Sequence, residues 1–221
     1  GGTLTTAATA IGGLAINTSK DVDQAMNSFI VQTGIAKNES GEWQKALEDI
    51  YKNNYGESFE DIANSMALAS QELYEFDPSQ IKAVTENALA LRDAFGVEVN
   101  ESIRATKALM TQFGISADEA YNLMAQGAQA GLDFSGELVD NINEYSVQFG
   151  KLGLSAEDMF NIFQSGADAG AWNLDKIGDA VKEFSIRAID GSKTTVEGFT
   201  KLGLNADTMA KKFAAGGDTA K

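Results

Sequence analysis

The chain has 221 residues, with no cysteine, no histidine and a formal net charge of −15 at pH 7. Without cysteine it holds no disulfide framework and no thiolate metal site, and without histidine it lacks the commonest general base and zinc ligand. Any enzymatic hypothesis therefore rests on carboxylates, and the acidic balance disfavours direct binding to nucleic-acid phosphates or to anionic membranes.

The composition favours helices. Hydrophobic residues make up 43% of the chain and charged residues 22%, and Pro78 is its one proline. Glycines fall mostly between amphipathic stretches, where they end helices. No segment combines a period of two with β-branched residues, which would indicate strands. The sequence predicts an all-α fold of about ten short helices.

Residues 1–34 are predicted to form an N-terminal amphipathic helical arm. Its apolar stretch "LTTAATAIGGLAI", residues 4–16, is interrupted by Gly12 and Gly13 and is too short to span a bilayer. We therefore expect a buried or self-associating helix, and no transmembrane segment in this chain. Because the sequence opens with Gly1-Gly2 and without methionine, we also expect a fragment of a larger protein.

A helical subdomain is predicted over residues 35–95. Its clearest signal is "DPSQIKAV", in which Asp77 is the expected N-cap, Pro78 takes the first helical position and Gln80 completes a capping box. Gly96 is expected to end that helix, and Asn100 is expected to cap the next one.

Residues 96–221 are predicted to be a region of helix-pair repeats. The stretches "FGISADEAYNLMAQGAQAG", "LGLSAEDMFNIFQSGADAG" and "LGLNADTMAKKFAAGG" resemble one another. Ser116 and Ser155 are expected N-caps with capping-box partners at Glu119 and Asp158, whereas Asn205 caps a third copy without a box. Three units follow: two near residues 114–152 and 153–202, and a partial one at 203–221.

The second half of the repeat is a longer amphipathic helix. "GLDFSGELVDNINEYSVQFGKL" aligns with "GAWNLDKIGDAVKEFSIRAIDG", and the extra residues of the second unit, which include "DGSKTTVEG", are interpreted as an insertion near a helix junction. One helix pair cannot bury its own apolar face, so neighbouring pairs are expected to stack as an irregular bundle or solenoid. Glycines spaced as Gly-xxx-Gly, at 127 and 131 and at 166 and 170, favour close helix packing in a soluble protein over membrane dimerisation.

Candidate chemistry is sparse. Adjacent acidic residues occur at 48–49, 60–61, 118–119 and 157–158, mostly in first helical turns, where carboxylates favourably oppose the helix dipole. No calcium-binding loop and no phosphate-binding glycine loop is present. We predict no catalytic, metal-binding or cofactor-binding residue. Trp172, in a loop that leads into a helix, is a candidate contact residue, with core packing as the other interpretation.

The longest of these stretches carry a resemblance to a known family. "NALALRDAFGVEVNESIRATKALMTQFGISADEA" and the two repeat units resemble the helical region of tail tape measure proteins of long-tailed bacteriophages and prophages, especially those of Gram-positive hosts. The resemblance covers residues 87–221 closely and residues 35–77 more loosely.

The resemblance implies a structural role in the virion. Members of the family lie inside the tail tube, template its polymerisation, set its length and leave ahead of the genome. The implied partners are the tail tube protein, tail assembly chaperones, distal-tail or tail-tip proteins, and further copies of the same chain. The implied location is the tail tube interior or tail end, after assembly in the host cytoplasm.

Two alternatives belong to other classes. One is a helical-repeat interaction module that contacts the host envelope or tail-tip proteins. The other is a cell-wall hydrolase that works with carboxylates alone, since a pair of carboxyl groups across a cleft suffices for glycoside hydrolysis. The resemblance implies no catalytic residue in this region, so neither an enzyme nor a cofactor is expected.

Overall fold

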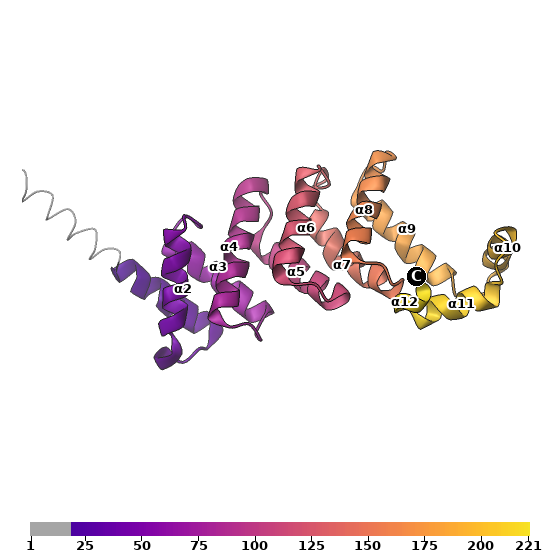
Figure 1. Ribbon diagram of the computed structural model, residues 1–221. Coiled ribbons are helices and arrows are strands. Elements are labelled where there is room, and N and C mark those ends of the chain that lie inside the picture. The colour runs from indigo at the N-terminus through magenta and orange to yellow at the C-terminus, as the bar shows by residue number, and fades with distance from the viewer. Residues whose placement is uncertain (1–18) are drawn as a thin grey trace, which may run out of the picture. The chain divides into compact units, whose positions relative to one another are not determined.

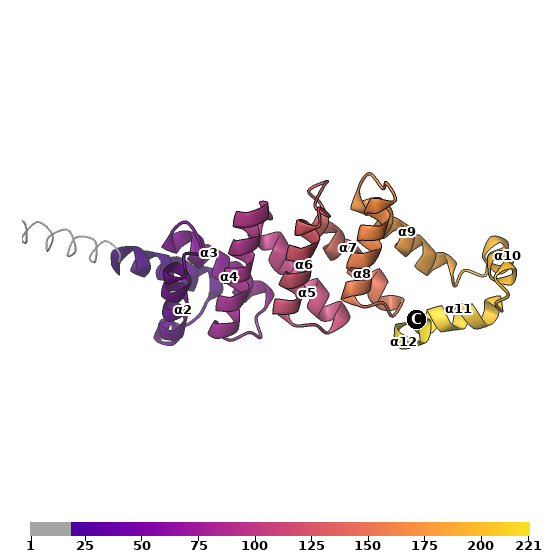
Figure 2. The ribbon, with the colours of Figure 1, turned by 45° about the horizontal axis from the view of Figure 1, so that its top comes forward.

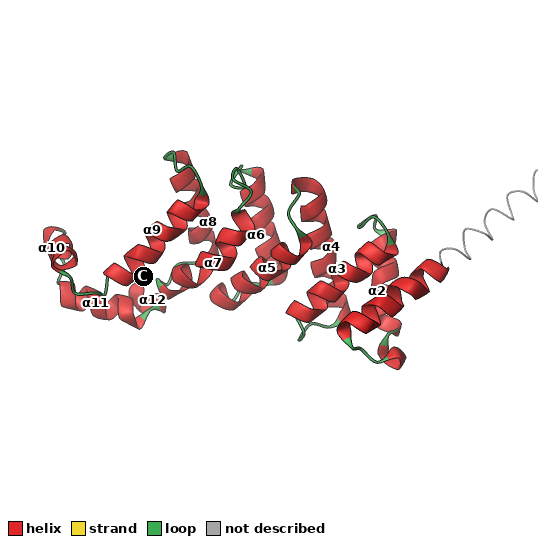
Figure 3. Cartoon of the chain, turned by 180° about the vertical axis from the view of Figure 1, so that it is seen from behind, coloured by secondary structure: helices red, strands yellow, loops and turns green. Residues whose placement is uncertain are grey.

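The computed structural model describes residues 19–221, and within that range the regular elements are all helical, with no strand (Figure 3). The predicted all-α class is confirmed. The backbone divides into two compact units, Gly1–Ile103 and Arg104–Lys221. The predicted boundaries near residues 34 and 95 stay a prediction, and the apolar stretch at 4–16 lies outside the described residues.

The first unit is a helical bundle. It contains a helix over residues 19–33, the short η1 (Lys37–Glu39), and then α2 (Gly41–Lys52), α3 (Phe59–Glu72) and α4 (Pro78–Phe95) (Figure 1). Helices α2, α3 and α4 each contact the other two. The largest fully buried side chains in this unit are Phe29, Leu47, Ile50, Ile62, Met66, Ile81, Leu89 and Ile103.

The helix over residues 19–33 packs within this bundle. The Phe29 ring lies 5.2 Å from that of Trp43 in α2. The Gln32 amide donates a hydrogen bond to Asn64 Oδ1 in α3 at 2.7 Å, and Gln71 in α3 donates to the Gln32 carbonyl at 2.9 Å. Apolar and polar contacts together therefore join the predicted arm, from residue 19 onward, to α2 and α3.

A bidentate ion pair joins α3 to α4. The two terminal nitrogens of Arg92 donate to the two carboxylate oxygens of Asp61 at 2.8 and 3.1 Å. Burial alone would raise the pKa of Asp61, but the Arg92 guanidinium and the Glu57 backbone N–H outweigh burial and lower that pKa. The fork geometry of arginine fixes distance and orientation together.

The second unit contains the repeats. After α5 (Val99–Phe113), whose residues span the division, come α6 (Ala117–Gln129), α7 (Leu138–Lys151), α8 (Ala156–Asp168) and α9 (Leu174–Arg187). α10 (Lys193–Lys201), α11 (Ala206–Ala215) and α12 (Gly217–Ala220) follow. α6 and α8, the first helices of successive pairs, lie side by side (Figure 2), and α7 contacts α6, α8 and α9.

The Gly-xxx-Gly spacing has a structural reason in both pairs. The second glycine of each, Gly131 or Gly170, follows the end of its helix with φ of +81° or +93°, a conformation that glycine adopts without strain. The first glycine is a packing position. A Cβ on Gly127 would lie 3.0 Å from the Phe160 ring, and one on Gly166 would lie 2.5 Å from Ile177 Cδ1. Each helix end thus combines a turn signal with a close helix contact.

Candidate functional site

The most specific polar contact in the repeats lies between α7 and α9. Tyr145 is 1% exposed, and its hydroxyl oxygen lies 2.7 Å from Asp175 Oδ1 and 3.0 Å from Asp179 Oδ1. Burial, together with the two carboxylates, raises the pKa of this phenol well above its ordinary value. Tyr145 therefore stays protonated and donates a charge-assisted hydrogen bond, which suits a structural link between helices and not a general base.

Glycine allows this contact to form. A Cβ on Gly178 would lie 2.5 Å from both Cγ and Cε2 of the Tyr145 ring, so only glycine lets the ring rest against α9 between the two aspartates. One turn further along the same interface, Ser185 Oγ donates to Gln148 Oε1 at 3.2 Å. The aspartates are spaced i, i+4 and share one hydroxyl donor, an arrangement that holds α9 in one register on α7.

Neighbouring polar atoms on α7 are buried without a partner. Asn141 is 4% exposed, and its Nδ2 donates to the Glu137 carbonyl at 2.9 Å. Its Oδ1 and the Oε2 atom of Glu137 make no hydrogen bond within the chain. These two acceptors lie one helical turn apart at the start of α7.

Metal binding has no support among residues 19–221. No group of three or more acidic, histidine or cysteine side chains in that range is placed to hold an ion. No helix in the same range is both long and apolar enough to cross a membrane.

The acidic residues in first turns act as caps and ion-pair partners. Four carboxyl groups have a lowered pKa: Asp61 through Arg92 and the Glu57 N–H, Glu119 and Asp158 chiefly through the backbone N–H groups of Ser116 and Ser155, and Asp190 chiefly through that of Ser192. A general acid in glycoside hydrolysis needs a raised pKa. The geometry of these four groups therefore gives the hydrolase alternative no support.

The predicted N-caps lie at the starts of their helices, except for Asn100. The Asp77 carboxylate accepts from the Gln80 N–H, the Gln80 side chain accepts from the Asp77 N–H, and Pro78 opens α4. The same reciprocal bonds join Ser116 to Glu119 and Ser155 to Asp158. Asn205 accepts from Thr208 N–H at 2.9 Å without a reciprocal bond.

The assignment of Asn100 as an N-cap is wrong. α5 begins at Val99, and the N–H of Ser102 donates to the Glu98 carbonyl at 3.0 Å. Asn100 is therefore the second residue of the helix. The physical reason is that Val99, 7% exposed, is buried in a helical conformation, so the chain turns helical before it reaches Asn100.

Trp172 lies on the surface. Its side chain is 75% exposed, and Lys176 Nζ lies 5.7 Å from the ring centroid. The core-packing interpretation is therefore wrong, while a role in contacting a partner stays a prediction.

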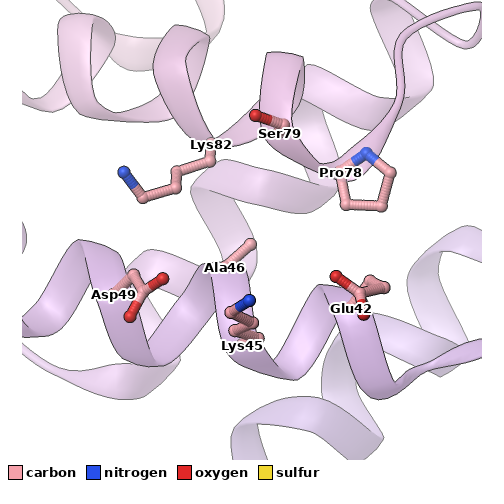
Figure 4. Close-up of a pocket in the computed structure, with 7 residues that line it drawn as sticks. All are labelled: Glu42, Lys45, Ala46, Asp49, Pro78, Ser79 and Lys82. Carbon is pink, nitrogen blue, oxygen red and sulfur yellow. The ribbon is translucent and has the colours of Figure 1, made fainter.

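A pocket in the first unit and a groove in the second differ in the charge of their lining residues. A pocket of about 140 Å³ lies between α2 and the start of α4 (Figure 4), and its charged side chains are Glu42, Asp49, Lys45 and Lys82. Two positive and two negative charges give it no preference for an anion or a cation. A groove of about 360 Å³ lies between α6 and α8, lined by Leu123, Gln126, Gly127, Ala130, Leu132, Glu157, Phe160, Asn161 and Gln164.

The described chain is an all-α protein of packed helix pairs, in which the specific polar contacts join helices to one another. Comparison with known families identifies the particular family. Residues 51–221 match the family described as phage-related minor tail protein, and the chain belongs to that family. No solved structure matches the chain.

A curated relative is the probable tape measure protein of Streptomyces phage phiC31. It is 42% identical over 137 residues, which cover 62% of this chain and 19% of the relative. The resemblance to tape measure proteins is thereby confirmed, and the matched region spans about a fifth of the relative's length. The family match identifies the chain as part of a phage tail protein.

Proposed function

We propose that this chain is a segment of a tape measure protein that acts in tail tube assembly and in setting tail length, and later in genome delivery. The single observation that carries the proposal is the 42% identity to a probable tape measure protein over 137 residues. The use of Asp61, Glu119, Asp158 and Asp190 in helix caps and an ion pair, with lowered pKa values, supports a structural role for these acids.

The proposed partners follow from that role. They are the tail tube protein, the tail assembly chaperones, distal-tail or tail-tip proteins, and further copies of this chain. The proposed location is the tube interior or the tail end, reached from the host cytoplasm during assembly. With a net charge of −15, the chain is expected to release DNA that moves through the same tube, since like charges disfavour binding.

The fold raises a question about how such a segment measures length. A helix rises about 1.5 Å per residue, so a ruler is longest as one extended helix. This chain is divided by caps and glycines into short helices that fold back on one another. We therefore propose either that these units lie at one end of the tape, where they start assembly, or that they fold only outside the tube.

Cross-linking of intact tails tests the proposal. Lys193 and Lys201 are exposed at the two ends of α10. Amine-reactive cross-linking of tails from the encoding phage is expected to join this chain to the tube protein or to a tail-end protein. Peptide mapping of the products identifies the partner. Recovery of this chain from infected cells but never from purified tails would contradict the proposal.

The groove between α6 and α8 favours a second candidate function. Leu123, Gly127 and Phe160 give it an apolar floor, and three amide side chains lie along it, as in sites that bind peptides by both shape and hydrogen bonds. A module of this kind would contact host-envelope or tail-tip proteins. Pull-down of such a protein that is abolished by Phe160→Ala would support this function.

A further inference from the structure

Two turns in the second unit share one sequence pattern and one backbone structure. The α7–α8 turn, within residues 151–159, reads "KLGLSAEDM", and the α10–α11 turn, within residues 201–209, reads "KLGLNADTM". Gly153 and Gly203 each have φ of +73°, and the amides around each glycine make the same set of backbone hydrogen bonds. What covers one turn therefore indicates what the other can bind.

The two turns differ in the exposure of their apolar side chains. Leu152 is 8% exposed, whereas its equivalent, Leu202, is 74% exposed. Leu154 is half-buried, whereas its equivalent, Leu204, is 42% exposed. In the first copy of the repeat, both apolar residues of the corresponding turn, 113–115, are half-buried. Exposure of both side chains is therefore particular to the α10–α11 turn.

Helix α12 covers the α7–α8 turn. A Cβ on Gly153 would overlap the carbonyl oxygen of Gly217, the first residue of α12, and Ala220, its last residue, is 8% exposed. α12 also contacts α7 (Figure 1). Among the described residues a Cβ on Gly203 would meet nothing within 4 Å, and the α10–α11 turn projects from the rest of the unit (Figure 2). The occupied turn thus takes one turn of helix that begins and ends with a small residue.

The charges beside the two turns also differ. Lys221, which follows α12, lies with its Nζ 3.4 Å from Asp158 Oδ2 in α8. In α11 the equivalent of Asp158 is Thr208, and the exposed Lys211 and Lys212 follow it by one helical turn on the same face. The surface beside the α10–α11 turn therefore favours an acidic residue at the position that Lys221 takes beside the α7–α8 turn.

We propose that the α10–α11 turn binds a helical turn of a partner protein, in which two small residues three positions apart are followed directly by an acidic residue. The first small residue lies against Gly203, as Gly217 lies against Gly153. The exposed leucines gain apolar contact, and the acid lies near Lys211 and Lys212. The inference rests on the two matched turns and goes beyond the proposed tail function, on which it does not depend.

A protein segment fits this surface better than the other candidate occupants do. The matched turn binds a piece of helix, which gives a protein occupant a direct example in the same unit. An anionic lipid surface is repelled by the net charge of −15 on the chain. The α12 helix of a second copy is followed by Lys221, whose charge is the same as that of Lys211 and Lys212.

Nuclear magnetic resonance on the full, ¹⁵N-labelled chain tests the proposal with two synthetic peptides. One peptide copies residues 214–221, "AAGGDTAK", and the other carries Lys221→Glu. The acidic peptide is expected to shift the amides of Leu202, Gly203 and Leu204 with a dissociation constant of about 1 mM. The lysine peptide is expected to bind at least threefold more weakly. Unshifted amides at this turn, or equal affinities for the two peptides, would overturn the proposal.

Variants of the lysines test the charge preference. Lys211→Glu combined with Lys212→Glu is expected to reverse the order of the two peptides, because the seat then carries negative charge. Both positions are exposed and glutamate is a good helix former, so circular dichroism should show unchanged helicity. An unchanged order of affinity in the double variant would refute the proposed role of these lysines.

A variant of the glycine tests the seat itself. Gly203→Asn adds a side chain where the partner's small residue is proposed to lie, and asparagine tolerates a left-handed backbone. The acidic peptide is expected to bind this variant at least fivefold more weakly. Gly191→Asn is the matched control, since Gly191 has φ of +65° and its added Cβ also meets nothing within 4 Å. Equal binding to the two variants would contradict the seat.

The same spectra distinguish the other occupants. Vesicles of phosphatidylglycerol that broaden the Leu202–Leu204 amides, with no response to the acidic peptide, would assign the surface to anionic lipid and overturn the proposal. Shifts at these amides that depend on the concentration of the chain alone would assign it to a second copy, with the same consequence. Since none of these measurements uses tails, they leave the proposed tail function to be judged from cross-linked tails.

Discussion

The close contact of Gly178 with Tyr145 predicts a large effect from adding one methyl group. In Gly178→Ala the new Cβ meets a fully buried ring whose hydroxyl is held by two aspartates. Overpacking of this kind costs about 1–3 kcal/mol. Displacing the ring also weakens hydrogen bonds to charged groups, a loss of about 1.5–3 kcal/mol. Alanine has the higher helix propensity, which offsets about 1 kcal/mol of this loss in stability.

The net expectation is a loss of about 2–5 kcal/mol, or roughly 8–20 °C in the melting temperature of the second unit. Gly198 is the matched control, because it also lies inside a helix, α10, and a Cβ there meets nothing within 4 Å. Gly198→Ala is expected to stabilise by about 0.5–1 kcal/mol. Differential scanning calorimetry of the two variants makes the comparison. A Gly178→Ala variant as stable as Gly198→Ala would refute the described packing of α9 on α7.

Further predictions concern the caps, an ion pair and the tyrosine. Ser155→Ala is expected to lose about 1 kcal/mol in urea unfolding. Ser40→Ala should change little, because Ser40 stands at the N-cap position of α2 but its Oγ donates to the Lys37 carbonyl and accepts no N–H of that helix. Asp61 has a lowered folded-state pKa, so its stabilisation is complete above about pH 4 and is lost as pH falls further. Asp61→Asn should therefore lower stability at pH 7 and make no difference in strong acid; equal losses at both pH values would contradict the ion pair. Tyr145→Phe should cost about 1–3 kcal/mol by removing the donor shared by Asp175 and Asp179, with the fold unchanged by circular dichroism.

Local patterns predicted the helix starts because a capping box depends on residues three apart. Asp77, Ser116 and Ser155 each carry the acceptor, and Gln80, Glu119 and Asp158 complete the boxes. The helix pairs and the packing role of Gly127 and Gly166 follow from repeated spacing in the same way. The prediction for Asn100 failed because α5 begins at Val99, and the burial of Val99 is a tertiary contact that a local pattern does not contain.

Local sequence patterns did not predict the contacts between helices. Asp175 and Asp179 look like ordinary surface acids on α9, and only the packing of Gly178 against α7 brings Tyr145 to them. The spacing Asp-x-x-Gly-Asp opposite a repeat tyrosine was the available signal. The stretch "DGSKTTVEG", interpreted as an insertion, supplies most of α10, with Ser192 as its N-cap. Its threonines and glycine have low helix propensity, so the sequence did not predict this helix, which tertiary contacts of buried Phe199 stabilise.

Deletion of one repeat tests the role in tail length most directly. Removing Gly114–Leu152 in frame from the encoding phage deletes 39 residues, which as an extended helix inside the tube span about 60 Å. A segment that is extended inside the tube predicts tails that are uniformly shorter by about that length in electron micrographs, whereas a segment that starts assembly from one end predicts no tails or tails of unregulated length. Tails of wild-type length on fully infectious particles would contradict a function in tail assembly, length determination and genome delivery.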